Sequence, residues 1–192
     1  MTKNQTSLEH LNLEFWNLFR ISDLEFSLCI KNMQKYKILI LVSITVVILD
    51  QLTKAIITHY LSLHQSIEVI SSFFNIIHIK NPGVAFGLFR NSSELFRILF
   101  LTGMSLIALI AVFFVYSKTE NNLAYRIALS LIAGGAMGNL IDRIRLGEVT
   151  DFLDVYIGQY HWPAFNVADS AITIGVFLTI FFLREGKNVG KH

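Results

Sequence analysis

The sequence predicts a mainly α-helical, polytopic membrane protein: a four-transmembrane-helix bundle with a small extracytoplasmic β-rich subdomain. The first observation is composition, because 53% of the 192 residues are hydrophobic and only 16% are charged. The second is the presence of four long apolar stretches, which an ordinary soluble domain of this size does not need. The third is a segment between the first two stretches that is rich in β-branched and aromatic residues and contains a turn.

The chain length predicts one domain, preceded by an extension. We expect residues 1–34 to be an N-terminal extension outside the core and residues 35–192 to be the membrane domain. The extension is polar and amphipathic, and Met33 is a second candidate for the start of the chain. The basic lead into the first apolar run resembles a secretory signal, but Asp50 and Lys54 replace a small-residue cleavage site. We therefore expect a retained helix.

The four predicted spans occupy residues 37–57, 98–116, 123–143 and 166–183. The second has no charge and is about 28 Å long as a helix, close to the thickness of a hydrocarbon core. The third and fourth reach a full crossing only when they are extended through their polar ends. A short polar link around Asn121 and Asn122 makes the second and third spans antiparallel neighbours.

Two loops are predicted on the outer side of the membrane. Residues 67–89 contain the turn Asn81-Pro82-Gly83 and are expected to form short strands. Residues 146–164 mix acids with Tyr160 and Trp162, as in a segment that rests at the membrane interface. Lys and Arg are more frequent on the opposite side, which predicts cytoplasmic termini.

Polar residues of the spans gather at this outer face. An ionisable group in hydrocarbon costs about 2.5 to 3.5 kcal/mol on insertion scales, so a cluster of them needs a common reason. The cluster consists of Asp50, Lys54, Asn139, Asp142, Arg143, Asn166 and Asp169.

Several function classes are excluded or disfavoured by what the sequence lacks. The net charge of +2 is spread over the loops, so nucleic-acid binding has no support. The six histidines show no metal-ligand spacing, and no zinc-protease, serine-hydrolase or nucleotide-binding motif occurs. We expect neither a metal nor a cofactor.

Asp151 and Asp169 are the predicted catalytic pair, one just before the fourth span and one just inside it. Two adjacent carboxylates share a proton, so one can deprotonate water while the other hydrogen-bonds a scissile carbonyl. Such a pair hydrolyses amides. The alternative is a solvated loop acid plus an acid that stabilises a helix dipole. Asp154, three residues after Asp151, could be mistaken for the catalytic acid, but it is expected to be exposed.

Other polar residues have structural explanations beside functional ones. Asp50 and Lys54 are four residues apart and can neutralise each other on one helix face. Gly134 and Gly138 form a small-xxx-small surface for helix packing. Asn166 can cap the last helix while it orients Asp169. Asn139, Asp142 and Arg143 share one helix face and can form a hydrogen-bond network.

Five sequence blocks resemble the bacterial lipoprotein signal peptidases, the signal peptidase II family, and they occur in order over residues 33–183. They are Asp50-Gln51-Leu52-Thr53-Lys54, Asn81-Pro82-Gly83-Val84-Ala85-Phe86, residues 134–143, Val149-Thr150-Asp151-Phe152 and Phe165-Asn166-Val167-Ala168-Asp169. The leading extension is the only departure from the pattern.

The resemblance implies an aspartyl endopeptidase of the bacterial inner membrane that removes signal peptides from prolipoproteins before a diacylglyceryl-modified cysteine. It places the catalytic pair at Asp151 and Asp169 and makes Asp50 a support of the site edge. It gives Asn81, within its turn with Gly83, a contact to substrate or inhibitor backbone, and makes Asn139 and Arg143 polar contacts near the scissile peptide. It also implies inhibition by globomycin-type peptides and contact with membrane lipids; we expect a monomer.

Two other classes compete with this interpretation. A transporter or channel also carries intramembrane Asp, Lys, Asn and Arg, but its polar groups follow the depth of the membrane rather than one face. A noncatalytic assembly factor could use the same face for binding. Replacing Asp151 or Asp169 with Asn separates a protease from both.

Overall fold

The structure, a computed structural model, describes residues 34–83, 92–119 and 122–189, with side chains described up to residue 183 in the last helix. Two compact units divide the chain, Met1–Ile38 and Leu39–His192. The described part of the first unit, residues 34–38, is helical, and all the elements below lie in the second unit or extend into it. Apart from residue 34, the predicted extension lies outside the described residues.

The described helices are Gln34–Tyr60, α2 (Glu94–Lys118), α3 (Leu123–Leu146) and α4 (Val167–Val189). The first three are long and apolar enough to cross a membrane, and Val167–Leu183 is a shorter apolar helix. Together with a small antiparallel sheet, they confirm the predicted mainly helical class. The first helix and α2 extend beyond both ends of their predicted spans, and α3 and α4 extend only beyond the C-terminal end, because polar residues continue these helices past the apolar stretch.

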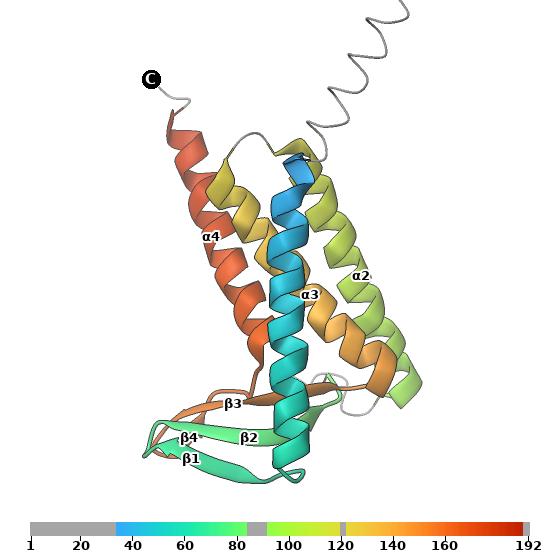
Figure 1. Ribbon diagram of the computed structural model, residues 1–192, viewed down its shortest axis with the longest axis vertical. Helices are drawn as coiled ribbons and strands as arrows, with labels where there is room; N and C mark the ends of the chain where they lie inside the picture. Colours follow the sequence, from blue (N-terminus) through green and yellow to red (C-terminus); the bar gives the residue numbers. More distant parts are fainter. Residues whose placement is uncertain (1–33, 84–91, 120–121, 190–192) are drawn as a thin grey trace, which may run out of the picture. The chain divides into compact units, whose positions relative to one another are not determined.

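α3 is the central helix of the second unit, since it packs against both α2 and α4 (Figure 1). Its glycines allow close contacts with the first described helix and with α4. A Cβ added at Gly134 would lie 2.8 Å from the Cβ of Val46, and one at Gly135 would overlap the carbonyl oxygen of Ala168. Most of α3 is buried, whereas few residues of α2 are buried, as expected of a helix that faces lipid.

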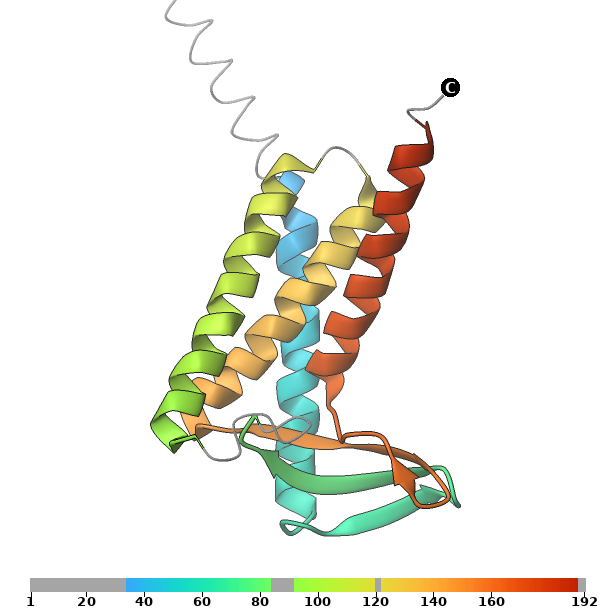
Figure 2. The ribbon, with the colours of Figure 1, turned by 180° about the vertical axis from the view of Figure 1, so that it is seen from behind.

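The four strands form one antiparallel sheet in the order β1-β2-β3-β4. Figures 1 and 2 show it at the end of the helices where α4 begins. The strands are β1 (Ser66–Ile70), β2 (Phe74–Asn81), β3 (Val149–Ile157) and β4 (Tyr160–His161). Except for Ser66, β1 and β2 fall inside the predicted strand region, whose residues 84–89 lie outside the described ranges.

β3 and β4 correct one expectation, because part of residues 146–164 forms paired strands where the sequence suggested an interfacial segment. β3 pairs with β2, some seventy residues earlier in the chain, with Ile79 opposite Asp151 and Asn81 opposite Val149. The sequence of β3 lacks a clean polar–apolar alternation because both of its faces are largely buried at its start. That distant pairing, rather than a local pattern, makes this segment a strand.

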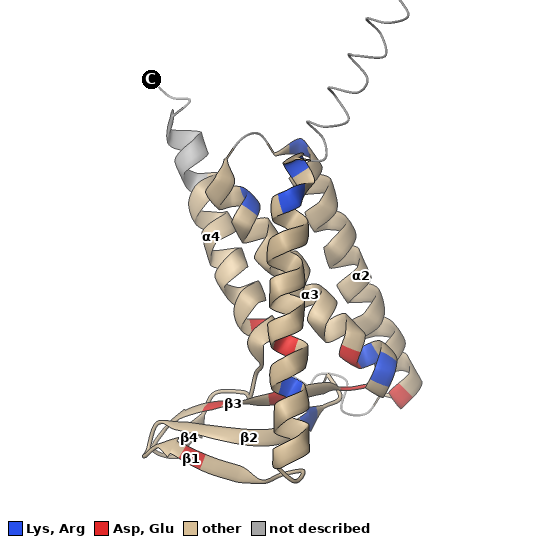
Figure 3. Ribbon diagram, in the orientation of Figure 1, with Lys and Arg blue, Asp and Glu red and all other residues tan. Residues whose placement is uncertain are grey.

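Charged side chains avoid the middle of the described helices (Figure 3). All the acidic groups drawn lie toward the sheet, whereas Lys118, at the end of α2, and Arg126, in the second turn of α3, lie at the other end. The described helices therefore have an apolar middle and two chemically different ends.

Candidate active site

Asp151 and Asp169 come from two neighbouring elements, the strand β3 and the helix α4. Asp151 lies on β3 and is 2% exposed, and Asp169 lies in the first turn of α4 and is partly buried. Phe165 connects the two elements, because its N–H donates to the Leu153 carbonyl and its own carbonyl accepts from Phe152 and Leu153. This short bridge holds the start of α4 against β3.

Two asparagines link the acids in one hydrogen-bond network. The amide Nδ2 of Asn166 donates to Asp151 Oδ1 at 2.7 Å and to Asn139 Oδ1 at 3.2 Å. The amide Nδ2 of Asn139 then donates to Asp169 Oδ1 at 2.7 Å. Every carboxylate oxygen in this path accepts from an N–H, so the network supports negative charge at both acids.

Asn166 also caps α4, as the sequence predicts. Its Oδ1 accepts from the Asp169 N–H at 2.9 Å, and Asp169 Oδ2 accepts from the Asn166 N–H at 3.3 Å. This reciprocal pair is a capping box built with Asn and Asp. Asp169 therefore has one oxygen bound in the cap and the other directed to Asn139.

Asn81 approaches the site from the end of β2. Its Nδ2 donates to Asp151 Oδ2 at 2.8 Å, while its Oδ1 accepts from the Gly83 N–H at 2.8 Å. Gly83 has φ of 86°, a conformation that favours glycine. A Cβ at Gly83 would also overlap Leu101 of α2. The turn thus fixes Asn81 against Asp151.

Burial raises the pKa of Asp151 to about 7. Desolvation is the largest cause, and repulsion from Asp169 adds to it. The hydrogen bonds from Asn81 and Asn166 and the charge of Lys54 act in the opposite direction. Burial dominates, so Asp151 keeps a proton over much of the range in which an ordinary carboxyl is ionised.

A buried ion network lies next to the pair. Lys54 Nζ lies 2.8 Å from Asp50 Oδ2 and 2.8 Å from Asp142 Oδ2, and it donates to Asn139 Oδ1 at 3.2 Å. Asp50 is fully buried, and its Oδ1 accepts from the Ala168 N–H at 3.0 Å. The first helix therefore supplies a cation between two acids and an additional cap for α4.

Arg143 reaches α2, where its Nη1 donates to Ser105 Oγ at 3.2 Å. Its charge still attracts the carboxylates of Asp169, Asp151 and Asp142. All nine residues singled out for the site lie in one region, but their contacts differ. Asn81, Asn139 and Asn166 bond one or both acids directly, Asp50, Lys54 and Gly83 act through a neighbour, and Arg143 interacts through charge.

Sequence reasoning missed Gln51 and Ser105. Gln51 Nε2 donates to Asp142 Oδ1 at 2.9 Å and also reaches Asp50 Oδ2 and the Gly138 carbonyl. Gln51 is a polar residue next to Asp50 in an apolar helix, and this position could have identified it from the sequence. Ser105 gives no such signal, because serines that bond their own helix are common in membrane spans.

The expectation that Asp154 is exposed is wrong, since it is 6% exposed. Its carboxylate accepts from Asn75 Nδ2 at 2.9 Å and lies 2.8 Å from His161 Nδ1. Because strand residues alternate in direction, Asp154 stands on the opposite face of β3 from Asp151. It belongs to a separate cluster of the sheet.

No group of three His, Cys, Asp or Glu side chains is placed to hold a metal ion within residues 34–83, 92–119 and 122–189. The site offers two carboxylates in a largely water-excluded setting, held by amide donors. Such an arrangement can hold a shared proton and polarise a water molecule.

Comparison with known proteins agrees with the blocks seen in the sequence. The family model described as "Signal peptidase (SPase) II" matches residues 42–184. The lipoprotein signal peptidase of Syntrophus aciditrophicus is 50% identical over 158 residues, which are 81% of this chain and 98% of that protein. That of Desulforapulum autotrophicum is 51% identical over 144 residues, covering 74% and 89%.

Two solved structures of bacterial membrane enzymes share the fold. A bacterial membrane enzyme determined by the in meso method at 2.3 Å resolution is 41% identical, with a TM-score of 0.71 over 80% of this chain and 92% of that one. A second, at 1.9 Å, is 42% identical with a TM-score of 0.68, covering 76% and 91%. Sequence and fold together show that this chain belongs to the signal peptidase II family.

Proposed function

We propose that the protein is an aspartyl endopeptidase that removes signal peptides from prolipoproteins by cleaving before the diacylglyceryl-modified cysteine. Membership of the family implies a protease. The observation that carries the aspartyl mechanism is the joint network of Asp151 and Asp169 through Asn166 and Asn139. No other pair of carboxylates among the described residues is bridged by two amide side chains in this way.

The reaction uses one proton shared by the two acids. Asp151, with a pKa near 7, is the member that holds the proton and donates a hydrogen bond to the scissile carbonyl oxygen. Asp169 accepts a proton from water as the water oxygen attacks the carbonyl carbon. The tetrahedral intermediate collapses when that proton passes to the leaving nitrogen and the C–N bond breaks, which returns the pair to its starting state.

Neighbouring residues serve this step by position and charge. Asn81, Asn139 and Asn166 keep the carboxyl planes fixed, which lowers the cost of reorganisation in the transition state. Lys54 and Arg143 supply positive charge near two acids that would otherwise repel each other. Arg143 lies toward α2, and a substrate backbone between α2 and α3 would meet its guanidinium.

The family and the apolar helices indicate a multi-pass protein of a bacterial inner membrane. We place the sheet and the acids at the outer face and the termini in the cytoplasm. The greater number of Lys and Arg residues that the sequence places on the side of the termini supports this orientation under the positive-inside rule. The four helices then form the membrane bundle, the protein works as a monomer surrounded by lipid, and globomycin-type peptides block the site.

The test replaces each acid separately. Asp151→Asn and Asp169→Asn are each expected to reduce cleavage of a diacylglyceryl prolipoprotein by about 10³-fold or more, because each removes one half of the acid–base pair. Cleavage by purified protein and accumulation of prolipoprotein in cells are the measurements. Asp154→Asn is the matched control on the other face of β3 and should keep most activity. Normal processing by both site variants would end the proposal.

A further inference from the structure

The two acids of the candidate site are each preceded by a residue whose N–H is bound by a buried carboxylate. Thr150 precedes the acid of β3, and its N–H donates to Asp142 Oδ2 at 3.3 Å. Ala168 precedes the acid of α4, and its N–H donates to Asp50 Oδ1 at 3.0 Å. The positions of these two carboxylates therefore affect directly where the two acids lie.

The contact at Thr150 takes the place of a strand neighbour. β2 lies along one edge of β3, and on the other edge β4 pairs with Tyr156 and Ile157. The N–H and C=O of one residue in an antiparallel strand point to the same side, and the Thr150 carbonyl accepts from Asn166 Nδ2 at 3.4 Å. Side chains of Asp142 and Asn166 therefore fix the free edge of β3 at this residue.

Gln51 of the first described helix bridges the two anchoring carboxylates. Its Nε2 donates to Asp142 Oδ1 at 2.9 Å and to Asp50 Oδ2 at 3.2 Å. An amide nitrogen carries two hydrogens, so one side chain can serve both acids at once. Within the part of the chain that the structure describes, Gln51 is the one partner of Asp142 Oδ1, whereas Oδ2 has both Lys54 and the Thr150 N–H.

Lys54 also joins the two carboxylates, but it contributes charge rather than direction. Its Nζ lies 2.8 Å from Asp50 Oδ2 and 2.8 Å from Asp142 Oδ2. An ammonium is a compact charge whose donors rotate, so it does not fix the plane of a carboxylate. The Gln51 amide binds the other oxygen of Asp142 and thereby fixes the rotation that turns Oδ2 toward Thr150. Removing this amide changes the geometry while the net charge stays the same.

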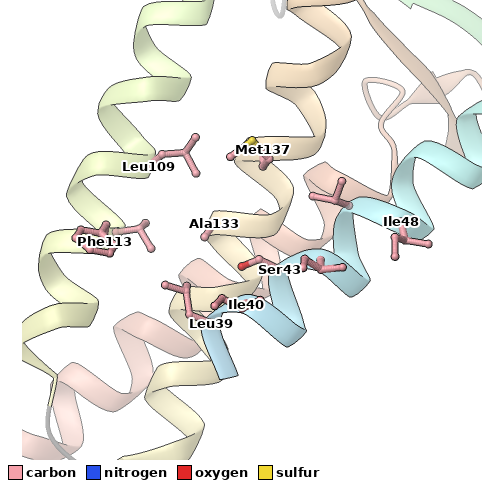
Figure 4. A pocket seen from close by; sticks show the side chains of 11 residues that line it. Leu39, Ile40, Ser43, Ile48, Leu109, Phe113, Ala133 and Met137 are labelled. Carbon is pink, nitrogen blue, oxygen red and sulfur yellow. The ribbon is translucent and has the colours of Figure 1, made fainter. Parts of the chain in front are cut away.

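The helical repeat brings Gln51 to this place. Ile40, Ile44 and Val47 line a hollow that the first described helix shares with α2 and α3 (Figure 4). Gln51 comes seven residues after Ile44 and four after Val47, so it continues the same stripe of the helix. The apolar stripe therefore ends in an amide that faces α3, the helix that carries Asp142.

We propose that Gln51 is a positioning residue of the peptidase reaction, which sets the separation of Asp151 and Asp169 by bridging the carboxylates that anchor their neighbours. This inference rests on the proposed function, because it assumes that the two acids act together. Gln51 bonds Asp142 and Asp50 rather than the acids, so its effect reaches them through the backbone. A misplacement of about 1 Å can cost about 10²-fold in rate, so the chemical step should respond more than substrate binding.

The first experiment compares Gln51→Met, which removes the amide but keeps the length of the side chain, with Thr53→Val. Thr53 lies on the same helix, and its hydroxyl donates to the Leu49 carbonyl of that helix at 2.7 Å. Gln51→Met is expected to lower kcat for prolipoprotein cleavage by about tenfold with KM within about twofold of wild type. Thr53→Val should keep the wild-type kcat. An unchanged kcat for Gln51→Met, or a loss confined to KM, would overturn the proposal.

A double-mutant cycle tests whether Gln51 acts through Asp142. Gln51→Met is combined with Asp142→Leu, which removes the carboxylate and keeps its shape, and kcat is compared for the four proteins. In the Asp142→Leu background, Gln51→Met should lower kcat by less than about twofold, because the bridge is already lost and coupled residues are not additive. An equal loss of about tenfold in both backgrounds would show that Gln51 acts independently and would rule out the proposed route.

The third measurement needs neither catalysis nor the folding of Asp142→Leu. Hydrogen exchange of the Thr150 amide is followed by NMR on full-length protein in detergent micelles, for wild type, Gln51→Met and Thr53→Val. Exchange should be about tenfold faster in Gln51→Met alone, because a rotating Asp142 carboxylate protects that N–H less. The same exchange rate in all three proteins would contradict the proposal. Normal cleavage by the two aspartate variants described above would instead contradict the proposed function, and the Thr150 exchange rate does not depend on that outcome.

Discussion

Two asparagine side chains, Asn139 and Asn166, decide the geometry of the acidic pair. Lys54 donates to Asn139 Oδ1, so the Nδ2 of that amide must face Asp169. The Asp169 N–H donates to Asn166 Oδ1, so the Nδ2 of that amide must face Asp151. A cation and a main-chain group thus fix which end of each amide meets a carboxylate. Lys54 therefore orients Asn139 toward Asp169, and the Asp169 N–H orients Asn166 toward Asp151.

In the Asn81→Ala variant, the fall of kcat/KM on the alkaline side of the pH profile should occur at a higher pH than in the wild type. The Asn81 hydrogen bond lowers the pKa of Asp151 against the larger effect of burial, so its loss raises that pKa further above 7. Activity that requires a proton on the pair then persists to higher pH, although the maximum rate falls. The measurement is the pH profile of kcat/KM for prolipoprotein cleavage. The apparent pKa of this profile belongs to the pair of Asp151 and Asp169 together. A limb that shifts to lower pH, or stays in place, contradicts this account.

Asp151 should also make stability depend on pH. Its pKa is near 7 in the folded state and 3.8 in the reference state, so the folded state binds more protons between these values. The free energy of unfolding therefore falls as pH rises from about 4 to about 7, and Asp151→Asn removes this decrease. Thermal unfolding of both proteins in detergent at pH 4, 6 and 8 is the measurement. The variant should gain stability relative to wild type with rising pH, and parallel curves would refute the expected linkage.

At the scale of elements, α3 and α4 can approach closely because glycines occupy their contact. Gly135 faces the Ala168 carbonyl, and Gly175 of α4 faces the Ala128 carbonyl, so each helix presents a flat surface to the other. Gly138 leaves room for the Asp50 carboxylate, which reaches past α3 to cap α4. The small-residue spacing in the sequence predicted packing, and the same spacing also lets a charged group from another helix enter.

Gly135→Ala should destabilise the protein, because the new methyl group overlaps the backbone oxygen of Ala168 and forces α4 away. Overpacking of this kind costs about 1 to 3 kcal/mol, more than the helix propensity gained from alanine. Gly103→Ala on α2 is the matched control, since nothing lies within 4 Å of its added Cβ. Thermal unfolding in one detergent compares them. Equal melting temperatures for the two variants would show that the α3–α4 contact is not tight at Gly135.

At the scale of the whole second unit, Lys54 connects elements that are far apart in the chain. It lies on the first described helix, pairs with Asp142 of α3, and neutralises Asp50, which caps α4. Asp142 Oδ2 also accepts from the Thr150 N–H, which joins the network to β3. Three helices and the sheet therefore meet at one buried cation.

Lys54→Met should destabilise the protein by about 3 to 5 kcal/mol, because it leaves two buried carboxylates without a counter-charge. Lys80→Met is the control: its ion pair with Glu148 is 3.7 Å long and partly exposed, and such pairs contribute about 1 kcal/mol or less. Thermal unfolding and yield from membranes are the measurements. If both variants unfold at the same temperature, the buried network does not hold the unit together.

Much of this architecture was predictable from local signals. The apolar stretches give the helices, and the Asn-Pro-Gly turn with β-branched neighbours gives β1 and β2. β3 was missed because its strand character comes from pairing with β2 and from burial of both faces. The predicted site residues lie in one region, and their catalytic and binding roles stay predictions. Asp154 was misplaced because the sequence does not show which face of a strand is covered.

The sequence by itself determined the helical class, the family, and which polar side chains stand in apolar surroundings. These properties follow from hydropathy, spacing and motif order, which are local or additive along the chain. Only the tertiary structure decided which amide nitrogen meets which acid and that Asp50 caps a helix 118 residues away. These relations join groups across separate elements, and distances between such groups are set by packing rather than by position in the chain.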